Sequence, residues 1–131
     1  MSVVVDTSVI IAVIGNEPEK DVLVKLTQGA DLVAPHSVHW EIGNAFSAMF
    51  KRNRVTLGQA VRAIQIYQKI PIRFVDVELE RALEIAEMAD IYAYDAYLIG
   101  CALKYKSPLI SLDNKLVDSA KRMQVQVVEV T

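Results

Sequence analysis

Residues 2–15 read SVVVDTSVIIAVIG, and the strand at the start of this stretch decides how the rest of the chain is interpreted. Residues 3–5 form a continuous run of valines, which is typical of a strand buried on both faces of a parallel sheet. Asp6 follows that strand directly. Open α/β sheets collect ligands beyond the carboxyl ends of their strands, so Asp6 is a candidate site residue.

The rest of the chain alternates short β-rich runs with helical stretches. Further strands are predicted at residues 31–34, 72–75, 109–112 and 125–130, and helices at 18–29, 36–50, 57–70, 78–88, 94–105 and 115–123. This alternation predicts an α/β fold, a three-layer sandwich in which a parallel sheet of about five strands is covered by helices on both faces. The 131 residues fit one domain over 1–131.

Two helices carry local signals. Thr56 and Gln59 have the spacing of a capping box, which predicts a helix start at this point. In the helix at 78–88 we expect Leu79 and Leu83 to face inward and the glutamates to form a solvated face.

Composition excludes several classes of protein. The net charge of −2 argues against binding of nucleic acid by bulk positive charge. The single cysteine, Cys101, excludes an internal disulfide. No stretch approaches the roughly 18 apolar residues of a membrane helix, and the apolar start lacks the basic residues of a signal peptide. We therefore expect a cytoplasmic protein that does not bind a membrane.

Four of the sixteen acidic residues differ from the others. Most acids lie in a first helical turn or on a polar helix face. Asp6 and Asp113 instead end predicted strands, and Glu41 lies within two turns of the end of another. No Lys or Arg occurs at residues 1–19, 26–50 or 82–103, the windows that contain Asp6, Glu41 and Asp95. Because uncompensated carboxylates are costly in apolar surroundings, this pattern favours a site for Mg²⁺ or Mn²⁺, which prefer oxygen ligands.

Each acid also has a structural interpretation. Asp6 fits a cap after a strand, Asp95 fits a helix N-cap, and Asp113 fits an Asx turn or a cap of the next helix. A distant arginine folding back onto any of them would remove the need for a metal ion. Asp118 fits an exposed helix residue better than a further site acid.

Four segments together resemble the PIN-domain nucleases, and within them the VapC-type toxins of toxin–antitoxin pairs. They are VVVDTSVIIA, HWEIGNAF, YDAYLIGCALKY and PLISLDNKL, at residues 3–12, 39–46, 94–105 and 108–116. The resemblance implies that Asp6, Glu41, Asp95 and Asp113 are the catalytic, metal-binding acids. It also implies supporting roles for three polar residues: Ser8, Asn44 and Ser111. Ser111 departs slightly from the family, which usually has threonine there.

This resemblance implies a metal-dependent endoribonuclease that hydrolyses RNA phosphodiester bonds with one or two Mg²⁺ or Mn²⁺ ions, leaving 5′-phosphate and 3′-hydroxyl ends. It implies a small antitoxin as partner and a homodimer. Lys51, Arg52 and Arg54 are candidate RNA-binding residues, although cations at a helix C-terminus also have a structural explanation. The alternative within the family is a PIN-domain nuclease of RNA processing or quality control that has no antitoxin.

A more distant alternative is a phospho-aspartate receiver domain, since Asp76 ends the predicted third strand. Receivers need two adjacent acids after the first strand, whereas Asp6 is followed by Thr7. His36 and His39 invite a zinc interpretation, but a third His and a cysteine ligand are lacking nearby, so we expect a structural or surface role for both.

Overall fold

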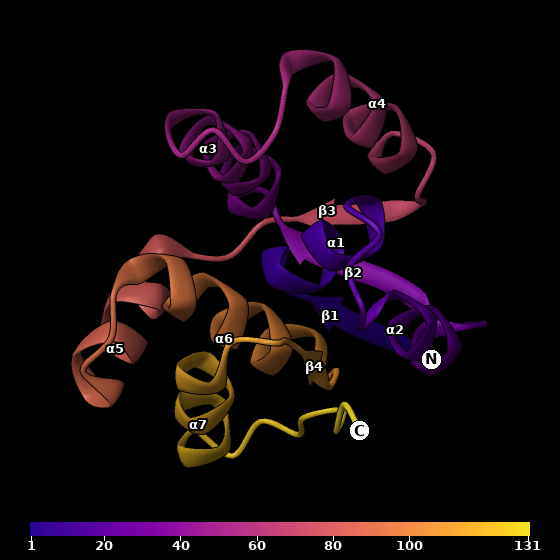
Figure 1. The fold of residues 1–131 in the computed structure, drawn as a ribbon. Coiled ribbons are helices and arrows are strands. Elements are labelled where there is room, and N and C mark those ends of the chain that lie inside the picture. The colour runs from indigo at the N-terminus through magenta and orange to yellow at the C-terminus, as the bar shows by residue number, and fades with distance from the viewer.

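A parallel sheet of four strands forms the centre of the protein in the computed structural model, which describes residues 1–131 (Figure 1). Its spatial order is β3-β2-β1-β4. The strands are β1 (Ser2–Val5), β2 (Asp31–Pro35), β3 (Ile72–Val75) and β4 (Leu109–Ile110). The central strand β1 pairs with a neighbour on each side, which is why its valines are almost fully buried.

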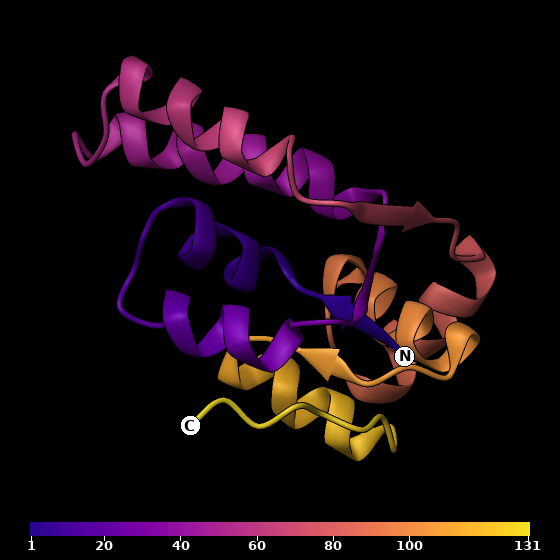
Figure 2. The same ribbon diagram turned by 90° about the vertical axis from the view of Figure 1, so that its right-hand side faces the viewer.

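Seven helices cover the sheet. They are α1 (Thr7–Ile14), α2 (Lys20–Thr27), α3 (Ser37–Lys51), α4 (Leu57–Tyr67), α5 (Leu79–Ala89), α6 (Ala93–Tyr105) and α7 (Asn114–Arg122). Figures 1 and 2 show α5, α6 and α7 gathered on one side of the strands and α1 to α4 on the other. The predicted three-layer α/β architecture is therefore confirmed. None of the helices is long and apolar enough to cross a membrane.

The strand order creates one topological switch point. The chain moves outward from β1 to β2 and β3, and then returns to the other side of β1 to form β4. Connections that leave neighbouring strands in opposite directions open a crevice at the carboxyl ends of those strands. Asp6 follows β1 and Asp113 lies shortly after β4, so both acids flank this crevice.

Helix α1 was not predicted. The sequence VIIAVI has no polar residue to mark a helical period, and short apolar runs do not distinguish strand from helix. In the structure Val9, Ile10, Ala12 and Ile14 are buried, because α1 packs against α2, α3 and α4. The first helix therefore begins one residue after Asp6, not near residue 18.

The predicted fifth strand at 125–130 is wrong as a full strand. Only an isolated parallel bridge, between Leu109 and Val127, joins this segment to β4. Strand β4 itself has two residues where four were predicted. Because β4 offers only two residues for pairing, the segment 125–130 does not form an extended ladder beside it, and the sheet has four strands.

The inward face of α5 also differs from the prediction. Leu79 and Leu83 are more than half exposed, and Ala82 and Ile85 fill the core in their place. The two alanines of this face, Ala82 and Ala89, leave room for α5 to pack closely against α6. The capping box of α4 is confirmed, since Thr56 accepts the Gln59 N–H and Gln59 accepts the Thr56 N–H.

Candidate active site

The Asp6 carboxylate is fixed from three directions. Its Oδ1 accepts the N–H of Thr7 at 2.8 Å, which makes Asp6 the N-cap of α1. Its Oδ2 accepts the hydroxyls of Ser8 at 2.7 Å and Ser111 at 2.8 Å. The backbone N–H of Asp6 donates to the carbonyl of Ile110, at the end of β4. Asp6 is only 7% exposed, and these bonds hold it rigidly in the crevice between β1 and β4.

The two serines also connect Asp6 to the segment that carries the last acid. The Ser8 hydroxyl accepts the N–H of Leu112 at 2.9 Å, and the Ser111 hydroxyl accepts the N–H of Asp113 at 2.9 Å. Residues far apart in the chain are therefore joined through two hydroxyls that each bond Asp6 as well. Ser8 and Ser111 thus both bond Asp6 and the segment that carries Asp113, and their supporting role in catalysis stays a prediction.

Glu41 reaches the same region from α3. Its Oε2 accepts the Thr7 hydroxyl at 3.0 Å, so the side chain is tied to the residue beside Asp6. Burial raises the pKa of the Glu41 carboxyl, the Thr7 hydrogen bond lowers it in part, and the negative charges of Asp6 and Asp95 raise it further. The sequence did not single out Thr7, and its position directly after Asp6 was the only signal that could have found it.

Asp95 is held by fewer polar contacts than the other three acids. It lies in the first turn of α6, partly buried, and its carboxylate has neither a hydrogen bond nor an ion pair. Burial raises the pKa of Asp95, and the charges of Asp113 and Asp6 raise it further. The N-cap interpretation is wrong, because Tyr92 occupies that position.

Asp113 caps α7, as one of its structural interpretations predicted. Its Oδ1 accepts the N–H groups of Lys115 and Leu116 at 3.0 and 3.4 Å. The other carboxylate oxygen has no hydrogen bond and stays available. A capping role and a ligand role are therefore compatible for this residue, because the two oxygens act separately.

None of the four acids pairs with a cation, although four ion pairs occur elsewhere. The donor set consists of carboxylate oxygens alone, which suits Mg²⁺ or Mn²⁺. As the side chains lie, no three acidic, His or Cys residues stand close enough to hold an ion. Glu41, Asp95 and Asp113 are partly or fully exposed, and each keeps at least one carboxylate oxygen without a hydrogen bond, so the residues fit a divalent cation.

A family model described as PIN domain matches residues 3–122, which is most of the chain and includes all four acids. The chain belongs to the PIN domain family. No curated protein is similar enough in sequence to match it.

Solved structures share the fold of this PIN domain at low sequence identity. PAE2754 from Pyrobaculum aerophilum superposes with a TM-score of 0.72 at 21% identity, over 91% of this chain and 79% of that one. VapC20 from Mycobacterium tuberculosis, a sarcin–ricin loop cleaving toxin, gives 0.64 at 16% identity over 90% and 95%. VapBC2 from Rickettsia felis, solved bound to a DNA fragment from its promoter, gives 0.67 at 14% identity over 98% of each chain.

The remaining predicted residues of the PIN domain lie farther from the acids. Asn44 is exposed one turn along α3 from Glu41. Lys51, Arg52 and Arg54 lie at the far end of α3, with Lys51 roughly 15 Å along the axis from Glu41 at 1.5 Å per residue. The structure does not bring these cations to the acid cluster, and RNA contact by them stays a prediction.

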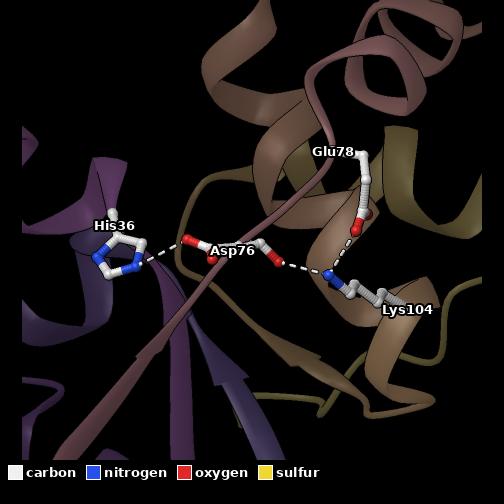
Figure 3. A network of polar contacts seen from close by, with 4 residues as sticks. All are labelled: His36, Asp76, Glu78 and Lys104. Carbon is white, nitrogen blue, oxygen red and sulfur yellow. Dashed lines mark hydrogen bonds and ion pairs between the residues drawn. The ribbon is translucent and has the colours of Figure 1, made fainter.

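His36 and Asp76 belong to a polar network that joins the β2–α3 connection, the β3–α5 connection and helix α6 of the PIN domain (Figure 3). His36 Nε2 lies 3.2 Å from Asp76 Oδ1, and Lys104 Nζ donates to the Asp76 carbonyl at 3.0 Å and to Glu78 at 2.7 Å. Asp76 is 92% exposed and lies on β3's side of the sheet, away from the β1–β4 crevice. This arrangement gives His36 a surface role, and it offers no receiver-type site.

Proposed function

We propose that this PIN domain is a Mg²⁺- or Mn²⁺-dependent endoribonuclease that cleaves RNA phosphodiester bonds. One observation carries the proposal: four carboxylates from separate elements lie near enough to influence one another's charge around the β1–β4 crevice, and none has a cation partner. Membership in the PIN domain family supports a nuclease. The two raised pKa values, at Glu41 and Asp95, support a site whose negative charge is compensated by something outside the chain.

In this mechanism Asp6, Asp95 and Asp113 would bind the cation, and Glu41 would complete the shell or orient the attacking water. A bound divalent ion would activate water and neutralise the charge that develops on the phosphate. Asp6 is the fixed reference because three donors hold it. The Thr7 hydroxyl donates to Oε2 of Glu41, and this bond limits the positions from which the carboxylate could accept a hydrogen bond from the attacking water.

We also propose that the nuclease is the toxin of a VapBC-type pair and acts in the cytoplasm as a homodimer. Similarity of fold to VapC20 and to VapBC2 supports the toxin assignment, and this similarity is one of fold alone. The antitoxin would bury an extended or helical segment across the acidic crevice. Growth arrest on expression, relieved by the product of a small upstream reading frame, would support the toxin. A complex whose partner left the four acids open would contradict it.

An RNA-processing nuclease without an antitoxin is the second candidate function, and the same fold supports it. The two differ in what expression does to the cell. A processing enzyme would cleave defined RNA precursors without arresting growth, and no neighbouring gene product would inhibit it. RNA profiles after expression of wild type and of an inactive variant separate the two.

The nuclease itself is tested by RNA cleavage with Mg²⁺ or Mn²⁺, with and without chelator. Asp6→Asn keeps the size of the side chain and removes its charge, so cleavage is expected to fall by orders of magnitude while the fold persists. Asp21→Asn, an exposed aspartate of α2, is the matched control and should retain full activity. Cleavage that continues in chelator, or that survives Asp6→Asn, would overturn the proposal.

A further inference from the structure

A groove of about 530 Å³ opens beside Asp95, between the start of α6 and the side of α7. One wall contains Tyr92 and Asp95, and the other contains Lys115, Asp118 and Arg122. Since Asp95 belongs to the acid cluster, a polymer bound at the reaction centre can continue directly into this groove. Its lining holds three acids, Asp90, Asp95 and Asp118, and combines two cations with an aromatic ring, the two features by which proteins bind single-stranded nucleic acids.

Lys115 is poorly placed for stability. It is the second residue of α7, where the helix dipole disfavours positive charge. Its side chain is exposed, and its ammonium has no acidic partner within ion-pair distance. Because this ammonium neither stabilises its helix nor pairs with an acid, it remains available to a ligand in the groove.

Tyr92 is also a locally unfavourable choice. It is the N-cap residue of α6 and makes no side-chain capping bond, where Ser, Thr, Asp or Asn is preferred. Its side chain is 89% exposed, so the ring contributes little to the core. Departures from local preference gather at functional sites, and here two of them, Tyr92 and Lys115, line one groove.

Arg122 forms a fixed part of the same wall. Its Nη2 donates to the Ala89 carbonyl at 3.2 Å and to the Ser119 hydroxyl at 3.1 Å. These bonds tie the end of α7 to the end of α5 and hold the guanidinium in place. Arg122 therefore supplies a positive charge that does not have to be ordered when a ligand binds.

We infer that this groove holds the RNA strand next to the cleaved bond, with a backbone phosphate on Lys115 and a base stacked on Tyr92. The inference rests on the proposed nuclease function. Base stacking on aromatic rings and phosphate contact by lysine are the usual means of binding single-stranded RNA. Asp118 lies on α7 between Lys115 and Arg122, so its charge opposes the phosphate and weakens binding.

The test measures binding of a short fluorescent single-stranded RNA by anisotropy, in an Asp6→Asn background so that the RNA stays intact. Lys115→Gln should weaken binding severalfold and reduce the magnitude of the salt slope by about 0.7, the value for one phosphate contact on a single strand. Tyr92→Ala should weaken binding about 5- to 140-fold, the effect of losing one stacked base. Asp118→Asn should tighten it. Lys69→Gln, at the opposite edge of the sheet just before β3, should change neither Kd nor slope.

Stability separates this role from a structural one. Lys115→Gln should leave the melting temperature unchanged or raise it, because the lost charge opposes the helix dipole. The groove assignment would be overturned if Lys115→Gln had the same Kd and salt slope as Lys69→Gln, or if its weaker binding were explained by lost stability. An inactive wild type whose RNA binding still depends on Lys115 and Tyr92 would count against the nuclease function and not against the groove. If wild type is active and its KM is unchanged by Lys115→Gln and by Tyr92→Ala, the groove assignment is wrong and the nuclease function stands.

Discussion

Replacing Ser111 by alanine removes a hydroxyl that joins two acids of the site. This hydroxyl donates to Asp6 Oδ2 at 2.8 Å and accepts the backbone N–H of Asp113 at 2.9 Å. Ser111 is 5% exposed, so water cannot readily replace either bond. The substitution therefore leaves a carboxylate with one donor fewer and a backbone N–H without its acceptor.

The two lost bonds determine the expected cost. A hydrogen bond to a charged group contributes about 1.5–3 kcal/mol and a neutral one about 0.5–1.5 kcal/mol. Because the Ser8 hydroxyl still bonds the same oxygen of Asp6, the combined loss should lie near the lower end, at roughly 2–3 kcal/mol. For a chain of this length that corresponds to a melting temperature about 6–15 °C lower.

Thermal unfolding in chelator compares Ser111→Ala with Ser111→Thr, which keeps the hydroxyl and introduces the family's usual residue. Amide hydrogen exchange at Asp113 should accelerate in the alanine variant alone. Cleavage with Mg²⁺ should fall at least about tenfold in that variant, because small displacements of positioned groups are costly for catalysis. If the alanine variant melts with wild type and Asp113 keeps its protection, the hydroxyl does not organise the site.

Three further outcomes follow from the structure. In chelator, the two carboxyls with raised pKa values, Glu41 and Asp95, contribute fully to stability below about pH 4, and this contribution is lost as the pH rises through their pKa values. In urea unfolding, Glu41→Gln and Asp95→Asn should therefore become more stable relative to wild type as the pH goes from acidic to neutral. Thr7→Val removes the bond that lowers the Glu41 pKa, so the acidic limb of the cleavage–pH profile should move to higher pH, whereas Thr7→Ser should leave it in place. Thr56→Ala removes the cap of α4 and should cost about 1 kcal/mol in urea unfolding without affecting cleavage; a change in cleavage would show that α4 contributes to the site.

Local sequence pointed to the candidate acids because strand ends, which mark Asp6 and Asp113, are visible in the sequence. The valines before Asp6 identify a buried parallel strand, and the carboxyl ends of such strands meet at one edge. Stretches without Lys or Arg then indicated which acids lack a nearby cation. The structure agrees, since no ion pair involves Asp6, Glu41 or Asp95.

Other features depend on contacts that local sequence does not contain. Helix α1 follows Asp6 because the surrounding helices bury its apolar residues, and the inward face of α5 is set by close packing on α6. The hydroxyl bridges from Ser8 and Ser111 join residues more than one hundred positions apart.

The sequence by itself determined the α/β class and the central strand, because burial periodicity is a local property, and it proposed the four acids from strand ends, from stretches without Lys or Arg and from the family resemblance. Only the tertiary structure decided that Thr7 restrains Glu41, that Asp113 both caps α7 and offers a free oxygen, and that Tyr92 and Lys115 face one groove. These relations arise when separate elements pack together, and a chain read residue by residue does not specify which distant groups that packing brings within hydrogen-bonding distance.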